Sequence, residues 1–136
     1  MKKYTFLLLM ALGLGLASCQ DPAKSRYYMD EGCKLMMSYS DFDEAERSFS
    51  KAIQYDKNNF EAYYYRGCAR TNARKYEEAI LDFNQAIALK PDYADAYFNL
   101  GRVYVILNDD DNACANYKLA QKHGRPNLED YLKRCP

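Results

Sequence analysis

The chain has 136 residues, a length that suits one small domain, and its 19 basic and 19 acidic residues balance to zero net charge. No basic stripe is present that could hold a row of phosphate groups. Nucleic acid is therefore not an expected partner of this chain.

The first residues have the pattern of an export signal. Lys2 and Lys3 form a basic start, and the apolar run at 6–17 is too short to span a bilayer but suits the core of a signal peptide. The run ends in Leu16-Ala17-Ser18-Cys19. This ending resembles the lipobox of bacterial lipoproteins, in which the cysteine is acylated and becomes the first residue after cleavage.

The resemblance implies a lipid-anchored protein of the bacterial cell envelope, carrying palmitate-type chains on Cys19. Several acyl chains on one cysteine hold a domain firmly, because each buried CH2 group contributes roughly 0.8 kcal/mol. Gln20 follows the cysteine where an aspartate would resemble an inner-membrane retention signal, so the outer membrane is favoured. The alternative is an ordinary signal peptide cut nearby, with Cys19 an unmodified thiol.

A repeated pattern of small and aromatic residues occupies the rest of the chain, with a spacing of 34 residues. One repeat carries it at Tyr63, Gly67, Ala79, Phe83 and Ala86, and the next at Tyr97, Gly101, Ala113, Tyr117 and Ala120. The preceding repeat has Tyr28, Gly32, Ala45, Phe49 and Ala52, with one extra residue between its two halves. The pattern resembles the tetratricopeptide repeat, a helix–turn–helix unit, and implies an all-α, right-handed α-solenoid.

Helical periodicity within each half and polar, turn-like segments between the halves agree with this interpretation. Asp41 and Asp109 are placed to cap the helices that follow them. A single hairpin cannot bury its own apolar stripe, so several must stack, and the last segment is expected to form a short capping helix. The expected segments are a signal peptide at 1–18, a lipidated N-terminus and linker at 19–24, repeats at 25–59, 60–93 and 94–127, and the capping helix at 128–136.

Glycine in the middle of a helix is less favourable than alanine by about 1 kcal/mol, so its return in each repeat predicts a close approach of another helix. The expected partners are the alanines Ala45, Ala79 and Ala113 on the second helices. A second stripe lies about 100° round each first helix from the stripe that holds the tyrosine and glycine. In tetratricopeptide-repeat proteins this second stripe lines a concave groove. It holds Met29, Cys33, Met36, Tyr64, Cys68, Thr71, Phe98, Arg102 and Val105.

This predicted groove is soft and apolar, which favours a protein or peptide partner. Some tetratricopeptide-repeat proteins bind the terminal carboxylates of a peptide in this groove, with several basic and amide side chains. Only Arg102 could serve in that way here, so a carboxylate clamp is not expected. The opposing interpretation is that these aromatic residues are scaffold and that the cap or a neighbouring chain covers the groove.

Four cysteines besides Cys19 allow disulfides if the domain is exported. Cys114 and Cys135 are expected to lie close together and would join the cap to the last repeat. Cys33 and Cys68 form the second candidate pair, on neighbouring first helices. Four small buried hydrophobic side chains without any bond remain the third possibility.

No constellation of residues predicts chemistry. The single histidine, His123, has no cysteine or acidic partner at ligand spacing, and neither a phosphate loop nor a nucleophile elbow occurs. The expectation is a non-enzymatic adaptor without metal, cofactor or small-molecule substrate, which binds a peptide or helix in its groove. The alternative is a structural subunit or assembly factor of an envelope complex, of the type that assembles outer-membrane proteins or pilus secretins.

Overall fold

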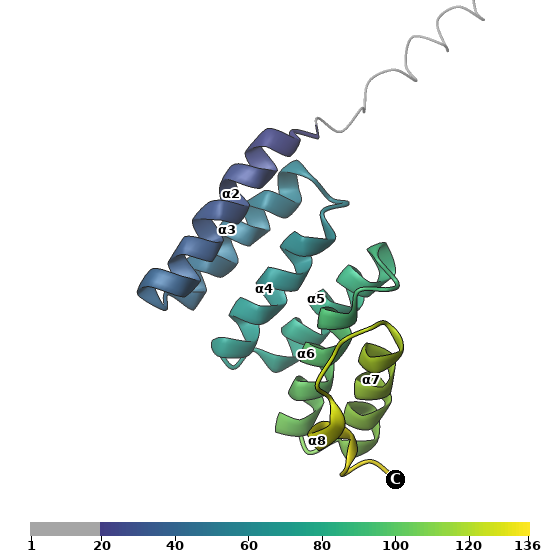
Figure 1. Ribbon diagram of the computed structural model, residues 1–136. Helices are drawn as coiled ribbons and strands as arrows, with labels where there is room; N and C mark the ends of the chain where they lie inside the picture. Colours follow the sequence, from purple (N-terminus) through teal and green to yellow (C-terminus); the bar gives the residue numbers. More distant parts are fainter. Residues whose placement is uncertain (1–19) are drawn as a thin grey trace, which may run out of the picture.

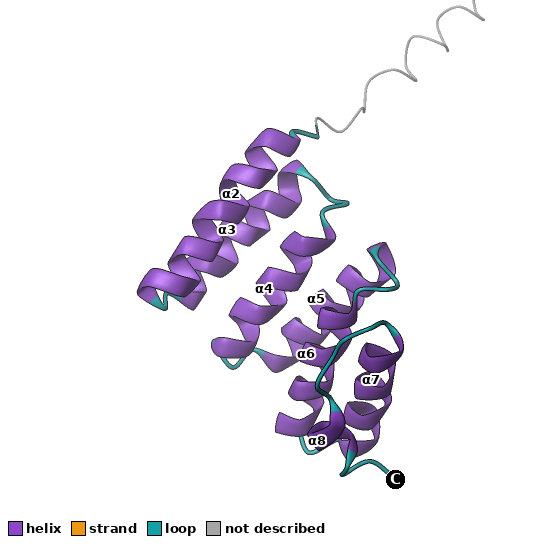
Figure 2. Cartoon of the chain, in the orientation of Figure 1, coloured by secondary structure: helices purple, strands orange, loops and turns teal. Residues whose placement is uncertain are grey.

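The computed structural model describes residues 20–136, and this part of the chain folds entirely into helices and loops (Figures 1 and 2). The predicted signal peptide and Cys19 lie outside the described residues. The helices are α2 (Pro22–Lys34), continued by the π-helix η1 (Leu35–Tyr39), α3 (Phe42–Tyr55), α4 (Phe60–Asn72), α5 (Tyr76–Leu89), α6 (Ala94–Ile106), α7 (Asp110–Lys122) and α8 (Glu129–Leu132). The predicted all-α solenoid is confirmed.

The helices pair in chain order. Within residues 20–136, α2 packs on α3, α4 on α5 and α6 on α7, and the three hairpins stack along the molecule (Figure 1). Short loops join successive helices, so each hairpin lies beside its neighbour in the sequence (Figure 2). The architecture therefore depends on local contacts, as expected of a repeat protein.

Side-chain caps explain where several helices begin. The carboxylates of Asp21, Asp41 and Asp109 and the amide oxygen of Asn59 each accept a hydrogen bond of 3.1 Å from a backbone N–H in the first helical turn. The capping roles predicted for Asp41 and Asp109 are confirmed. Because Asp21 caps α2 and Pro22 suits its first turn, α2 begins within the segment expected to be a linker.

The extra residue of the first hairpin is absorbed by η1. In this segment the backbone N–H of Ser40 donates to the carbonyl of Leu35, the five-residue spacing of a π-helix. Ser40 then ends the helix in a left-handed conformation with φ of 51°. Arg74 and Asn108 occupy the corresponding turns of the other hairpins, with φ of 62° and 58°. The insertion thus lengthens the first helix and leaves the turn type unchanged.

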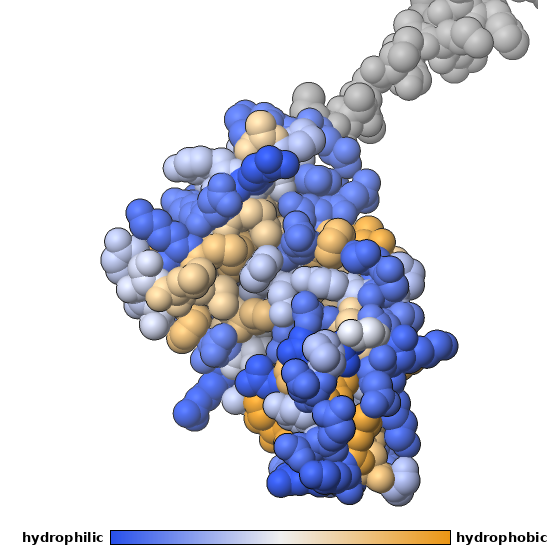
Figure 3. Space-filling view, in the orientation of Figure 1, coloured by the Kyte–Doolittle hydropathy of each residue, from blue (hydrophilic) through white to orange (hydrophobic). Residues whose placement is uncertain are grey.

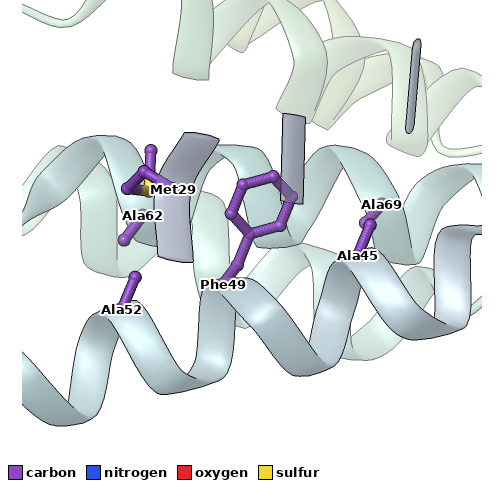
Figure 4. Packing of buried hydrophobic residues seen from close by; sticks show 6 residues of the cluster. All are labelled: Met29, Ala45, Phe49, Ala52, Ala62 and Ala69. Atoms are coloured by element: carbon purple, nitrogen blue, oxygen red, sulfur yellow. The ribbon is translucent and has the colours of Figure 1, made fainter. Parts of the chain in front are cut away.

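The mid-helix glycines make room for aromatic rings. A Cβ atom on Gly32, Gly67 or Gly101 would lie 2.6 to 2.8 Å from a ring carbon of Phe49, Phe83 or Tyr117 respectively. The predicted close approach is present, and at Gly101 the expected partner Ala113 takes part in it, with its backbone oxygen 3.2 Å from such a Cβ. In all three repeats, however, the nearest atoms belong to the ring and not to the expected alanines Ala45, Ala79 and Ala113. Those alanines are buried at the same interfaces, and the larger ring one turn later fills the space above each glycine. Figure 4 shows Phe49 and Ala45 projecting from the same helix in the first hairpin.

A buried ion network joins the first two hairpins. Asp82 on α5 is 2% exposed and accepts from Arg66 at 2.7 and 3.0 Å and from Arg70 at 2.8 Å. Arg70 also donates to Glu46 of α3 at 2.8 Å. The arginines on α4 therefore connect α3 with α5, and each buried side-chain nitrogen or oxygen atom among residues 20–136 has a hydrogen-bond partner.

The C-terminal segment covers the last hairpin. Leu128 is buried, and the ring of Tyr131 contacts those of Phe98 and Tyr117, both at 5.1 Å between centroids. A disulfide joins Cys114 to Cys135, with Cα atoms 5.4 Å apart. The regular part of this cap is the short helix α8 within the expected segment 128–136. None of the helices in residues 20–136 has the length and apolar character needed to cross a bilayer.

Candidate peptide-binding groove

The predicted groove residues differ in how far they reach the surface. Met29 and Phe98 are buried, at 9% and 8% exposed, and both belong to core clusters. Arg102 and Val105 are exposed. The others are half-buried, namely Cys33, Met36, Tyr64, Cys68 and Thr71. At Met29 and Phe98 the structure differs from the expectation that the whole stripe is open to a partner.

The following repeat explains this burial. Met29 of α2 packs in the same cluster as Ala62 and Ala69 of α4, so the next first helix covers it. Phe98 of α6 has no following repeat in residues 20–136, and the cap replaces it: Tyr131 contacts its ring edge and Arg125 lies 3.8 Å from its centroid. These two side chains are therefore structural.

Tyr64 is held in the middle of the molecule by polar and aromatic contacts. Its hydroxyl accepts a hydrogen bond of 2.8 Å from the side-chain amide of Asn99, and its ring lies 5.0 Å from that of Tyr93. Burial, together with the neighbouring Cys68 and Tyr93, raises the pKa of the Tyr64 phenol well above its usual range. Tyr64 thus stays neutral and links α4 to α6.

Tyr65 and Asn99 belong to the site although the sequence analysis did not select them. Tyr65 is half-buried, stacks on Phe49 at 5.8 Å and contacts Tyr64 edge-on at 5.1 Å. Asn99 donates to Tyr64 and accepts from Arg102 at 3.2 Å. In the sequence Tyr65 directly follows Tyr64, and Asn99 directly follows Phe98. Asp30 has the same position after Met29 on α2. The next first helix covers Met29 and the cap covers Phe98, while the residues that follow them in the sequence stay at least partly exposed, which a single repeat does not reveal.

Cys33 and Cys68 are free thiols, so the second candidate disulfide is not formed. Burial raises the pKa of Cys68 to about 11. The pKa of Cys33 is also raised, by burial and then by the nearby charges of Asp30 and Glu61. Both thiols are therefore protonated near neutral pH and are weak nucleophiles. Their small apolar surfaces contribute contact area to the groove.

Two hollows lie along this surface. A small one of about 80 Å³ is lined by Cys68, Thr71, Asn72, Phe83, Asn99 and Arg102. A larger one of about 350 Å³ lies between α6, α7 and the cap, and its lining includes Val105, Tyr117 and Tyr131 beside the disulfide. The larger hollow shares only Val105 with the predicted groove residues, and its volume is sufficient for a large side chain.

Exposed apolar surface accompanies the groove at both ends. Met37 of η1 is 86% exposed, next to the half-buried Met36. At the other end Val105, Ile106 and Leu107 are 38 to 46% exposed. Figure 3 shows hydrophobic surface where α2 faces α4, bordered by hydrophilic residues. Such a bordered apolar area is typical of a surface that contacts another chain.

Among the described residues no group of histidine, cysteine and acidic side chains has the arrangement of a metal site. The groove instead offers methionine, thiol and aromatic contacts with a few polar groups beside them. That arrangement suits non-covalent binding of another polypeptide.

Comparison with known families agrees with this geometry. Tetratricopeptide-repeat family models match residues 48–81 and 94–122, and a related TPR model matches residues 75–107. The match at 75–107 joins the second helix α5 of one hairpin to the first helix α6 of the next, because the pattern is periodic. Residues 48–122 therefore consist of tetratricopeptide repeats, and the fold is a tetratricopeptide-repeat solenoid.

Solved structures share this fold. The first TPR domain of Spaghetti (RPAP3), solved with the HSP90 peptide SRMEEVD, has a TM-score of 0.80 at 24% identity, over 85% of this chain and 93% of that one. The crystal structure of MamA has a TM-score of 0.70 at 32% identity, over 76% of this chain and 60% of that one. The likeness to Spaghetti concerns the fold alone.

Among curated proteins, heat shock protein STI1 of Saccharomyces cerevisiae is 33% identical over 81 residues, 59% of this chain. The Hsp70-Hsp90 organizing protein of Triticum aestivum is 35% identical over 77 residues. This chain spans only 14% and 13% of the lengths of these two proteins. The similarity is thus to one repeat segment within each longer protein.

Proposed function

We propose that this chain is a non-enzymatic adaptor that binds a peptide or helix of another protein along the groove formed by α2, α4 and α6. The observation that carries this proposal is the apolar surface beside the groove, above all Met37, which is 86% exposed next to Met36. Adjoining exposed apolar side chains that polar residues border are typical of a surface that contacts another chain. The peptide bound by the first TPR domain of Spaghetti supports this use of the fold.

Site-directed photo-cross-linking tests this proposal. A photoreactive amino acid placed at Met36 or at Arg102 is expected to give discrete adducts with a partner in the native cell envelope. Leu81, on α5 and 69% exposed, provides the matched control outside the groove. Adducts from Leu81 and none from Met36 or Arg102 would favour the structural-subunit alternative, in which a partner contacts the surface outside the groove.

We further propose that Cys19 is acylated and that the domain is tethered in a bacterial envelope, more specifically at the outer membrane. The support is the sequence of the first residues: a basic start, a short apolar run and the Leu-Ala-Ser-Cys ending. Cys19→Ser is expected to abolish palmitate labelling and to release the protein from membranes. Retained labelling of this variant would contradict the proposal.

A further inference from the structure

The cap is held to the last hairpin mainly at two points. At the first, Leu128 is only 2% exposed and packs in the core cluster of α6 and α7. At the second, the disulfide joins Cys135 to Cys114 of α7. Between these points Tyr131 is 41% exposed and Leu132 is only partly buried, so apolar packing holds the middle of the cap less firmly. The disulfide is therefore the stronger tie beyond Leu128.

Polar contacts add little to these two ties. In the described part of the chain, no hydrogen bond or ion pair joins residues 129–135 to α6 or α7. The adjoining carbonyl of Pro136 accepts a hydrogen bond of 3.1 Å from the exposed side chain of Lys118, and water replaces such a bond at little cost. The helix α8 has four residues, and so short a helix is not stable by itself in water. Without the disulfide, little would keep residues 129–136 in place.

The cap covers aromatic rings of the last hairpin. Tyr131 contacts the rings of Phe98 and Tyr117, which are 8% and 4% exposed. The hollow of about 350 Å³ lies beside these contacts, with Tyr117 and Tyr131 in its lining. The position of the cap thus decides how much apolar surface this end of the molecule presents.

The disulfide lies within reach of a reductant. Cys114 is buried but lines the hollow, and Cys135 is half-buried. Thiol–disulfide exchange requires a thiolate to reach a sulfur atom, and exposed disulfides are more labile than fully buried ones. Cys33 and Cys68 are already free thiols. Among residues 20–136 a reductant therefore changes this bond alone.

We propose that the bond between Cys114 and Cys135 is a reversible redox switch, which holds the cap over Phe98 and Tyr117 when oxidised and releases it when reduced by a dithiol. A thiolate of the dithiol attacks Sγ of Cys135, the S–S bond breaks, and its electron pair goes to Sγ of Cys114, which takes up a proton. The second thiol of the reductant then displaces Cys135, which is protonated in turn. The dithiol becomes a disulfide by losing two electrons, and both cysteines become thiols.

The released cap moves about a fixed point. Leu128 stays buried, so residues 129–136 leave the hairpin and expose the surfaces of Phe98 and Tyr117 that Tyr131 covers. The same anchor keeps Cys135 close to Cys114, so reoxidation restores the cover. The switch is independent of the proposed function, because it alters the cap whether or not a peptide binds along α2, α4 and α6.

Hydrogen exchange and dye binding of the purified protein test the switch. With dithiothreitol as the dithiol, the amides of Leu132 and Cys135, which donate to carbonyls within the cap, are expected to exchange at least roughly tenfold faster. Amides of α5 are expected to keep their rates, and those of α7 to change less than those of the cap. The dye 1-anilinonaphthalene-8-sulfonate, which binds exposed apolar surface, should fluoresce more strongly. Reoxidation with oxidised glutathione should reverse these changes.

Paired cysteine variants locate the response. Cys33→Ser combined with Cys68→Ser keeps the disulfide and is expected to respond to dithiothreitol as the parent does. Cys114→Ser combined with Cys135→Ser is expected to show fast cap exchange and strong dye binding with and without the dithiol.

Three results would each overturn the inference. The first is a disulfide that dithiothreitol leaves intact in the absence of denaturant. The second is a reduced protein whose cap exchange and dye binding equal those of the oxidised protein. The third is equal acceleration in the cap and in α5, which would mean that reduction unfolds the whole domain and does not release the cap.

Discussion

At the residue scale, glycine and aromatic positions act as pairs. Gly67 costs helix stability in isolation, yet the ring of Phe83 fills the space above it. Phe83 is completely buried, so the ring has no exposed side towards which it could move. The glycine thus lowers the intrinsic stability of its helix, but it allows the two helices of one hairpin to pack closely.

Gly67→Ala is therefore expected to destabilise the protein, although alanine favours helices. The new Cβ would lie 2.8 Å from Cε1 of Phe83, and displacing a packed ring typically costs about 1–3 kcal/mol. Urea unfolding followed by circular dichroism measures the change. Combining it with Phe83→Leu should recover part of the loss, because the smaller side chain makes room for the methyl group. A more stable single variant would contradict this pairing.

Asp82 is expected to be the most sensitive acidic residue of the described chain. Replacing it with alanine would leave Arg66 and Arg70 partly buried without their shared carboxylate, and breaking a buried pair in this way costs roughly 3–5 kcal/mol. Chemical denaturation tests the expectation. Asp92→Ala, which breaks the exposed pair with Lys90, serves as the control and should leave the unfolding midpoint nearly unchanged. Similar losses in both variants would argue against a special role for the buried network.

At the element scale, the sequence predicted the kinds of elements better than their contacts. The spacing of Gly67 and Gly101 located two first helices. It also predicted that another helix lies close to each glycine, because a glycine in the middle of a helix must have a packing reason. It did not identify the ring as the partner, since an alanine and an aromatic residue lie one turn apart on the same face. The extra residue of the first hairpin was visible, but its place in η1 depends on backbone hydrogen bonds.

The candidate site was harder to predict than the fold. Met29 and Phe98 have the side chains of a binding surface, yet the next first helix and the cap cover them. How far one repeat rotates over another decides which stripe stays open, and that rotation is a property of two repeats together. The contact of Tyr65 with Phe49 likewise depends on how two hairpins pack together.

The cap is expected to depend on its covalent link. The bond between Cys114 and Cys135 closes a segment with a sequence separation of 21, and a loop of that size typically contributes about 3 kcal/mol. Replacing both cysteines with serine should lower the stability of α7 and the cap by roughly this amount. Urea denaturation of the variant, beside the reduced and oxidised parent, provides the measurement. Identical stability of the reduced and oxidised parent would show that the packing of Leu128 and Tyr131 suffices.

At the scale of the whole molecule, the two ends of the solenoid are finished differently. The C-terminal end is covered by the cap and cross-linked by the disulfide. At the other end, Tyr27 and Lys34 of α2 are exposed, whereas the corresponding residues of α4, Ala62 and Ala69, are completely buried against the preceding hairpin. A stack of this kind opens most easily where a repeat has only one neighbour.

Hydrogen exchange of the backbone amides is therefore expected to be fastest in α2 and η1 and slowest in α5. Within residues 20–136 the first hairpin packs on one other hairpin and carries no disulfide, whereas α5 carries Phe83 and the network around Asp82 in the middle of the stack. In the variant with serine at both Cys114 and Cys135, exchange in α7 should accelerate towards that of α2, while α5 stays protected. Uniform exchange along residues 20–136 would instead mean that the hairpins open as one cooperative unit. The helix that opens first would then carry Met36 of the proposed groove. A bound partner should therefore slow amide exchange in α2 and η1 more than in the other helices.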